Sequence, residues 1–148
     1  YGGDRPFILG GVRIESTDIA IKAHSDGDVL LHALIDALLG CCAAGDIGTL
    51  FPDSDAKFEN ISSSVLLAET LELVRREGVE ITHVDLTVIA QAPRVAPFRK
   101  EIARNIANLM QLDEKSVNVK ATTEEGLGFT GARQGIKAMA AVTGLRRA

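Results

Sequence analysis

A short segment of the chain concentrates side chains that bind metals and phosphate. His24, Ser25, Asp26 and Asp28 bring one imidazole, one hydroxyl and two carboxylates into five residues, directly before an apolar stretch with helical spacing. The first turn of a helix has free amide donors and the positive end of the helix dipole, so it attracts phosphate. For Ser25 and Asp26 taken alone, ordinary helix capping explains the residue types equally well.

His32 is the residue that capping does not explain. It follows Asp28 by four residues and precedes Asp36 by four, so the three share one face of a helix. A carboxylate beside an imidazole can fix the tautomer that binds a metal. A single histidine on an apolar helix is more often a packed core residue, but these neighbours favour a ligand for Zn²⁺, Mn²⁺ or a similar ion. A tetrahedral site needs further ligands that this segment does not supply.

Two later segments suit the rest of a phosphorylated, hydroxyl-bearing ligand. In residues 45–55, glycines let backbone amides approach a ligand and aspartates accept hydrogen bonds from hydroxyls, which fits a polyol. In residues 120–131, Thr122 and Thr123 can bind phosphate oxygens, and the adjacent Glu124 and Glu125 can hold a hard cation. Turn chemistry and a solvated strand end remain the alternatives for these segments taken alone.

Composition limits the class of protein. A chain of 148 residues that is 46% hydrophobic predicts one compact domain over residues 1–148. The net charge of -4 gives no basic field for nucleic acid or an acidic membrane. The longest apolar stretch, residues 29–44, is too short and too polar to span a bilayer. The adjacent Cys41 and Cys42 do not reach disulfide geometry readily, so we expect a buried, reduced pair and a cytosol-like compartment.

Hydrophobic periodicity predicts the elements that position these segments. The expected order is a hairpin over 7–14, a helix capped by Asp26 that runs from 29 to 40 or 45, a long loop over 45–63, a helix over 62–78, a strand over 79–91, a helix that begins at Pro97, and a strand over 117–121. The tail, 135–145, fits either a helix or a strand.

This alternation predicts an α+β fold, an α/β sandwich in which a single sheet has helices on one face. The strand over 79–91 has hydrophobic residues on both faces at several positions. We therefore expect the uncovered face of the sheet to pack against other subunits.

Several motifs together carry a resemblance to one family. The chain resembles the 2-C-methyl-D-erythritol 2,4-cyclodiphosphate synthases in collinear motifs from Gly10 to Ile136, which are Ser25-Asp26-Gly27-Asp28 with His32, Asp36 to Gly40, Gly45 to Gly48, Phe51 to Asp53, Ala90 to Pro93, and Lys120 to Thr123. The resemblance implies a homotrimer with sites between subunits. It also implies an enzyme of non-mevalonate isoprenoid biosynthesis, which cyclises 4-diphosphocytidyl-2-C-methyl-D-erythritol 2-phosphate and releases CMP.

The resemblance also implies roles for individual residues. His24 and Thr123 match positions that stabilise the transition state. His32 matches a ligand of a Zn²⁺ site, and Glu125 matches a residue that helps hold Mg²⁺ or Mn²⁺ between the substrate phosphates. The implied substrate-binding residues are Ser25, Asp46, Ile47, Gly48, Phe51, Asp53, Asp55, Ala90, Arg94, Ala96, Ala121, Thr122 and Phe129. Among them, Asp46, Gly48 and Asp53 match the erythritol pocket, and the segments 90–96 and 121–122 match the cytidine pocket.

Three features depart from the family pattern. The family begins with a Gly-x-Asp-x-His segment that supplies two of the three zinc ligands, and no such segment precedes Tyr1 here, so we expect an incomplete zinc site. Arg94 stands where lysine is usual, which keeps the charge but changes its reach. Ala132 stands at the position of the family's arginine, and the resemblance assigns no role to the neighbouring Arg133.

The leading hypothesis is the synthase, and two alternatives belong to other classes. The first is a non-catalytic trimeric binding module that retained the nucleotide and polyol pocket after losing its metal ligands. The second is a metal phosphohydrolase, which is disfavoured because the sequence has no dense cluster of ligands for a metal pair. The expected location is the cytoplasm, or a plastid if the source is a plant or alga.

Overall fold

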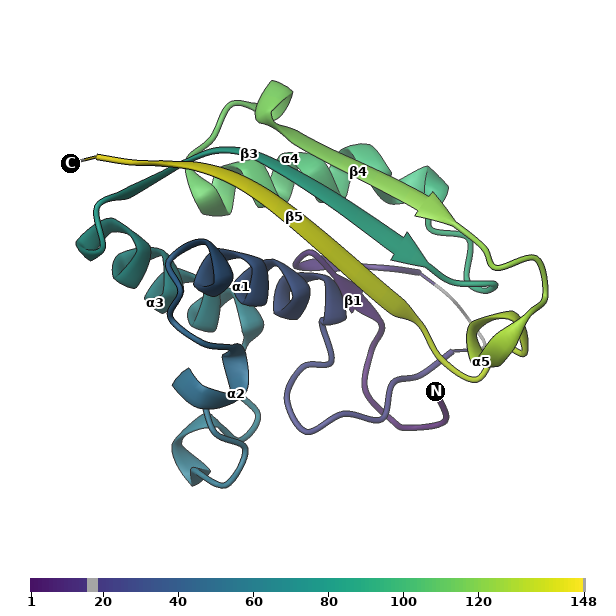
Figure 1. The fold of residues 1–148 in the computed structure, drawn as a ribbon. Coiled ribbons are helices and arrows are strands. Elements are labelled where there is room, and N and C mark those ends of the chain that lie inside the picture. The colour runs from purple at the N-terminus through teal and green to yellow at the C-terminus, as the bar shows by residue number, and fades with distance from the viewer. Residues whose placement is uncertain (16–18, 148) are drawn as a thin grey trace.

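The computed structural model describes residues 1–15 and 19–147 and has an α+β architecture (Figure 1). A mixed sheet has the strand order β4-β3-β5. Its strands are β3 (Val79–Ile89), β4 (Val117–Thr122) and β5 (Lys137–Arg146), and β3 pairs with β4 in parallel and with β5 in antiparallel orientation. A separate hairpin is formed by β1 (Ile8–Leu9) and β2 (Val12–Arg13).

Helices make up the rest of the regular structure. The α-helices are α1 (Val29–Cys41), α2 (Ile47–Leu50), α3 (Ser63–Arg76), α4 (Arg99–Met110) and α5 (Gly128–Gly131). Short 3-10 helices cover Ala56–Phe58, Ala96–Phe98 and Glu114–Ser116. Within residues 1–15 and 19–147, none of the helices has both the length and the apolar character needed to cross a bilayer.

The core lies between one face of the sheet and the long helices. On β3, Val84, Leu86 and Val88 are buried, and their neighbours on β4, Val117 and Val119, point to the same side. Helix α1 packs on β5 and α4 packs on β4, so both cover this face (Figure 1). The expected arrangement of one sheet with helices on one face is therefore confirmed.

The opposite face of the sheet is mixed rather than apolar. Asp85 on β3 accepts from Lys120 Nζ at 2.8 Å and from Asn118 Nδ2 at 3.0 Å, both on β4. These bonds hold the pKa of Asp85 below its ordinary value. On β5, Met139 and Leu145 have exposed fractions of 62% and 59%. The uncovered face thus combines an ion pair with two large exposed apolar side chains.

The strand β5 resolves the tail that periodicity left open. Most of its inward positions are small: Ala138, Ala140 and Val142 lie beside the buried residues Val88, Leu86 and Val84 of β3, and Gly144 follows on the same side. A Cβ added to Gly144 would lie 3.0 Å from Cys41 Sγ at the end of α1. Small side chains let the helix approach the strand, and they also remove the alternation by which a strand is recognised.

Two other expectations about this part of the chain need correction. The segment 45–63 was expected to be a long loop without regular structure, but it contains α2 and the 3-10 helix over Ala56–Phe58. Aspartates at their starts explain this: Asp46 and Asp55 each accept a hydrogen bond from a backbone amide in the following turn. Both cysteines are free thiols; Cys42 is buried as expected, and Cys41 is only partly buried.

Candidate phosphate and metal site

Asp28 is the anchor of the candidate site. Its carboxylate is fully buried, and Oδ1 accepts from Leu31 N at 3.0 Å, which makes Asp28 the N-cap of α1. The same carboxylate accepts from Gly10 N at 2.9 Å and Gly11 N at 2.7 Å in the β1–β2 turn. Burial raises the pKa of Asp28 to about 6, and the three amide donors oppose that rise. Asp28 therefore joins the hairpin to the helix.

The glycines of this turn are required by its geometry. Gly10 and Gly11 both have positive φ, at 59° and 78°. A Cβ on Gly10 would also lie 2.7 Å from Ile102 Cγ2 of α4. The turn can therefore adopt this conformation and pack against α4 only because both residues lack a side chain.

Asp26 links the same segment to α3 and is not the cap of α1, so that expectation was wrong. Its Oδ2 accepts from Ser63 N at 2.8 Å and its Oδ1 accepts from Ser63 Oγ at 2.5 Å. Asp28 N also donates to Asp26 Oδ1 at 3.1 Å. Ser63 is the first residue of α3, so the carboxylate satisfies an amide that has no partner inside that helix.

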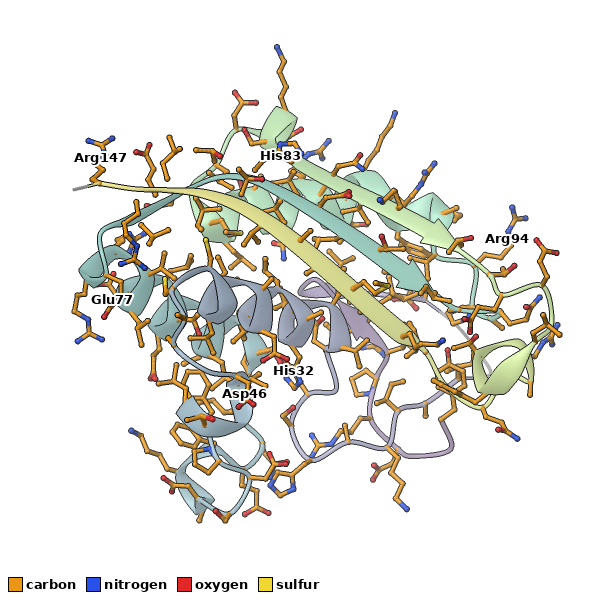
Figure 2. All side chains as sticks on the ribbon, in the orientation of Figure 1. His32, Asp46, Glu77, His83, Arg94 and Arg147 are labelled. Atoms are coloured by element: carbon orange, nitrogen blue, oxygen red, sulfur yellow. The ribbon has the colours of Figure 1, made fainter. Side chains whose placement is uncertain are left out.

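His32 projects from α1, away from the sheet (Figure 2). Its Nε2 lies 2.9 Å from Ser63 Oγ and 3.4 Å from Ser25 Oγ. Burial lowers the pKa of His32 below its ordinary value, and the negative charges of Asp26 and Asp36 partly offset this. A neutral imidazole keeps a nitrogen lone pair, which is what a metal ligand requires.

The carboxylates expected to orient His32 have other partners. Asp28 is engaged with the three amides described above, and Asp36 Oδ1 accepts from Ile47 N at 2.7 Å, at the start of α2. Neither carboxylate is hydrogen bonded to His32 in the described part of the chain. The expectation that an acid at helical spacing fixes the imidazole was therefore wrong, and Ser63 occupies that place.

A hollow of about 310 Å³ opens beside His32. It brings together seven of the residues that the sequence nominated, which are His24, Ser25, His32, Ile47, Gly48, Phe51 and Asp53. The Phe51 and Phe58 rings pack edge to face, with their centroids 5.3 Å apart, and line part of this hollow. We call the residues that line this hollow, from the start of α1 to α2 and the 3-10 helix after it, the first wall.

Two nominated residues near the first wall do not line it. Asp46 caps α2, and its Oδ1 accepts from Thr49 N and Thr49 Oγ1, both at 2.8 Å. These bonds lower the pKa of Asp46. Asp55 caps the following 3-10 helix by accepting from Lys57 N at 3.0 Å. Both aspartates therefore have a structural explanation that their spacing in the sequence already allowed.

A second, separate hollow of about 110 Å³ lies where the parallel strands β3 and β4 end. It contains six nominated residues, which are Ala90, Arg94, Ala96, Ala121, Thr122 and Thr123. Ala90 N donates to Thr122 O at 3.1 Å and joins its two sides. The carboxyl ends of parallel strands are a common place for ligands. We call the residues that line this second hollow the second wall. The two walls have no residue in common.

Glu125 and Phe129 lie outside both hollows. Glu125 is exposed, with φ of 55°, and its amide donates to Thr123 Oγ1 at 3.3 Å. Its neighbour Glu124 accepts from Thr130 Oγ1 and from Lys137 Nζ, bonds that lower the pKa of Glu124. Glu124 is therefore occupied, and Glu125 is the acid of this pair that faces solvent. Phe129 is 48% exposed, with Lys137 Nζ 5.5 Å from its ring centroid.

The donor set for a metal is limited. Within residues 1–15 and 19–147, no three His, Cys, Asp or Glu side chains come together as a metal site. His32 fits the role of one ligand, because its Nδ1 has no hydrogen-bond partner among the described residues. In that part of the chain, every buried side-chain nitrogen or oxygen has a hydrogen-bond partner. Because Nδ1 has none, it is accessible to solvent and therefore to a metal ion.

The fold and these hollows define an α+β domain with a candidate phosphate and metal site at the start of α1. Comparison with known proteins places this domain in a family, since the model of the YgbB family matches residues 1–144. The protein named 2-C-methyl-D-erythritol 2,4-cyclodiphosphate synthase from Clostridium botulinum (strain Kyoto / Type A2) is 51% identical over 137 residues, 93% of this chain and 88% of that protein. The chain belongs to the YgbB family, and the resemblance seen in its motifs is confirmed.

Other relatives are longer than this chain. The Bifunctional enzyme IspD/IspF of Oleidesulfovibrio alaskensis is 60% identical over 148 residues, which is 99% of this chain but 37% of that protein. The chain therefore spans little more than a third of this relative. The solved structure of IspF from Plasmodium falciparum in a CDP complex has a TM-score of 0.84 at 34% identity, covering 97% of this chain and 85% of that one. This likeness confirms the α+β fold.

Ser63 belongs to the site through its contact with His32 and was not predicted from the sequence. The serine run 62–64 was interpreted only as the start of a helix. The one available signal was the presence of three adjacent hydroxyls where one suffices for a cap.

Proposed function

We propose that this domain catalyses the cyclisation of 4-diphosphocytidyl-2-C-methyl-D-erythritol 2-phosphate to 2-C-methyl-D-erythritol 2,4-cyclodiphosphate, with release of CMP, in isoprenoid biosynthesis. In this reaction an oxygen of the 2-phosphate attacks the β-phosphorus. The bond from the β-phosphorus to the bridging oxygen breaks, and CMP leaves with that electron pair. The proposal is supported by the relative from Clostridium botulinum, which is named 2-C-methyl-D-erythritol 2,4-cyclodiphosphate synthase and is 51% identical over 93% of this chain.

The single observation that carries the proposal is the gathering of His24, Ser25 and His32 around one hollow beside the α2 loop. Phosphoryl transfer requires mainly positioning and stabilisation of charge on phosphate oxygens. His24 is exposed at the mouth of this hollow, where an imidazole can donate to a phosphate oxygen. Gly48 and Asp53 offer an amide and a carboxylate to the hydroxyls of the erythritol portion.

The second wall suits the cytidine portion. Its hollow is small, its lining includes the apolar residues Val88, Ala90 and Ala121, and it lies at strand ends, where backbone groups can bind a base. Thr123 stands at its edge, where its hydroxyl can donate to the transferred phosphate. The named CDP complex of the Plasmodium falciparum relative supports a cytidine diphosphate ligand for this chain.

A homotrimer explains how two walls without a common residue serve one substrate. In a cyclic trimer, the first wall of one subunit faces the second wall of its neighbour, and three equivalent sites form. The exposed Met139 and Leu145 on the uncovered face of the sheet would then be covered by other subunits. We place this assembly in the cytoplasm, or in a plastid for a plant or algal source.

Metal ions complete the proposal. We assign His32 as one ligand of Zn²⁺, and Glu125 as a ligand of Mg²⁺ or Mn²⁺ bound with the substrate phosphates. Divalent ions bound at these residues would neutralise the negative charge of the substrate phosphates. The chain's own residues position the phosphates from both sides: His24 and Ser25 on the first wall, and Thr123 on the second.

The test is an assay of CMP release from the diphosphocytidyl substrate, with the cyclic product identified by ³¹P NMR. The proposal predicts equimolar CMP and cyclodiphosphate, and loss of both after treatment with a chelator. Release of free phosphate would support the phosphohydrolase instead. Tight binding of CDP without turnover in the presence of Zn²⁺ and Mg²⁺ would support the binding module.

A further inference from the structure

Ser63 connects the predicted zinc ligand to a carboxylate. Its side chain is fully buried at the first position of α3. The hydroxyl lies 2.5 Å from Asp26 Oδ1 and 2.9 Å from His32 Nε2. The amide of the same residue donates to Asp26 Oδ2 at 2.8 Å. Asp26 thus holds both the backbone and the side chain of Ser63 against His32.

The chemistry of these three groups fixes the direction of each hydrogen bond. An ionised carboxylate only accepts, so the single hydroxyl proton of Ser63 is donated to Asp26. Toward His32 the hydroxyl then has only lone pairs and acts as an acceptor. The proton of the contact between Ser63 and His32 must therefore reside on His32 Nε2.

A proton on Nε2 leaves the lone pair of a neutral imidazole on Nδ1. This is the ring nitrogen without a hydrogen-bond partner among the described residues, and the ring lines the hollow that holds His24 and Ser25. Ser25 Oγ is 3.4 Å from Nε2, at the long end for a hydrogen bond, so Ser63 is the main partner.

We propose that Ser63, held by Asp26, is a positioning residue that locks His32 in the tautomer with Nε2 protonated and so presents Nδ1 as the metal-binding nitrogen. Histidine ligands of metals generally donate their other ring N–H to an oxygen that fixes the ring. The inferred chain, Asp26 to Ser63 to His32, places a serine between the carboxylate and the imidazole. Its use in catalysis rests on the proposed function, whereas the tautomer itself does not.

The decisive experiment observes the tautomer directly in the metal-free protein. Long-range ¹H–¹⁵N correlation spectra of the imidazole rings distinguish a protonated nitrogen from an unprotonated one. At a pH where His32 is neutral, we expect a single tautomer with the proton on Nε2. A proton on Nδ1 overturns the inference, and this measurement requires no variant that could fail to fold.

The variant Ser63→Ala tests the role of the hydroxyl, with Ser64→Ala as its matched control. Ser64 lies one residue further along α3, and its hydroxyl contacts Ser62 and not His32. Ser63→Ala keeps the amide that donates to Asp26, so the helix start is retained. We expect a mixture of His32 tautomers in Ser63→Ala and the parent spectrum in Ser64→Ala.

Zinc affinity provides the second readout, measured by competition with a chromophoric chelator on a chain extended upstream of Tyr1 by a Gly-x-Asp-x-His segment, because His32 alone does not make a complete zinc site among the described residues. Loss of an oxygen that orients a metal-binding histidine weakens binding by about 10- to 100-fold, and we expect this for Ser63→Ala only. An unchanged tautomer and an unchanged affinity in Ser63→Ala would overturn the inference. If the parent shows the expected tautomer but releases no CMP, the proposed function fails and the positioning role stands.

Discussion

The two walls of the candidate site are built in different ways. The first is cross-linked by side chains from distant elements, since Asp28 joins α1 to the hairpin and Asp26 joins the same segment to α3. The second lies where β3 and β4 end, and its side chains Arg94, Thr122 and Thr123 are exposed. The first wall is therefore held in place by hydrogen bonds between its own elements, whereas the second offers backbone groups and exposed polar side chains to a ligand.

Removing the anchor of the first wall should have the largest effect. The variant Asp28→Ala leaves the amides of Gly10, Gly11 and Leu31 without their acceptor in a buried place. Each unpaired buried group costs about 1–3 kcal/mol, so we expect the free energy of unfolding to fall by about 3 kcal/mol or more. Urea denaturation measures it.

The control for this variant is Asp85→Asn, which breaks an exposed ion pair with Lys120 on the open face of the sheet. Exposed pairs contribute about 1 kcal/mol or less, so this change should be small. Equal losses from the two variants would contradict the view that the first wall depends on Asp28.

The variant His32→Gln should separate metal binding from nucleotide binding. Glutamine removes the imidazole lone pair. In the same chain extended upstream of Tyr1, we therefore expect zinc affinity and CMP release to fall by at least about 100-fold, more than an orienting residue alone contributes. CDP affinity, measured by calorimetry without metal, should stay within about twofold because the second wall is untouched. A parallel loss of CDP affinity would mean that the two walls are not independent.

The reciprocal variant is Arg94→Ala on the second wall. A single exposed charge contributes about 1 kcal/mol, so CDP affinity should fall by about fivefold. Zinc affinity should not change. The variant Arg94→Lys keeps the charge and is expected to recover most of the lost affinity; if it behaves as alanine does, the planar guanidinium and not the charge is required.

The effect of pH on the first wall is gradual. The pKa of His32 is lowered in the folded protein by burial, so below the ordinary value of 6.5 the unfolded chain binds a proton that the folded chain does not. This lowers stability as the pH falls, with a slope of at most about 1.4 kcal/mol per pH unit. Asp28, whose pKa is raised to about 6, acts in the opposite direction between about pH 4 and 6.

Only a difference measurement isolates the histidine. The unfolding free energy of the metal-free parent minus that of His32→Gln should decrease as the pH is lowered from 7 to 5. Parallel profiles would show that the pKa of His32 is the same in the folded and unfolded states.

The sequence predicted those elements whose inner faces are large and regular. The strand β3 alternates Val84, Leu86 and Val88, and α3 presents leucines at helical spacing, so both were expected close to their observed bounds. The strand β5 was left open because Ala138 and Gly144 are small where α1 packs against them. Periodicity detects the size of side chains, and this strand lacks that signal.

The site was predictable in its residue types but not in its contacts. His24, Ser25 and His32 are close in sequence, so their common hollow follows from one loop and one helix. Asp26 was misassigned as the cap of α1 because its partner, Ser63, is 37 residues away in the sequence. The division of the nominated residues between two hollows depends on where β3, β4 and α2 lie in the tertiary structure, and local spacing carries no information on this.

The most direct test of the central claim, that the two walls belong to one site between subunits, is complementation between inactive variants. His32→Gln damages only the first wall and Thr123→Ala only the second. When equal amounts are unfolded and refolded together, random assembly into cyclic trimers gives about one quarter of the sites two intact walls. A site shared between subunits should give about a quarter of the parent rate of CMP release from the mixture, although each variant alone is nearly inactive. A mixture no more active than the separate variants would contradict it.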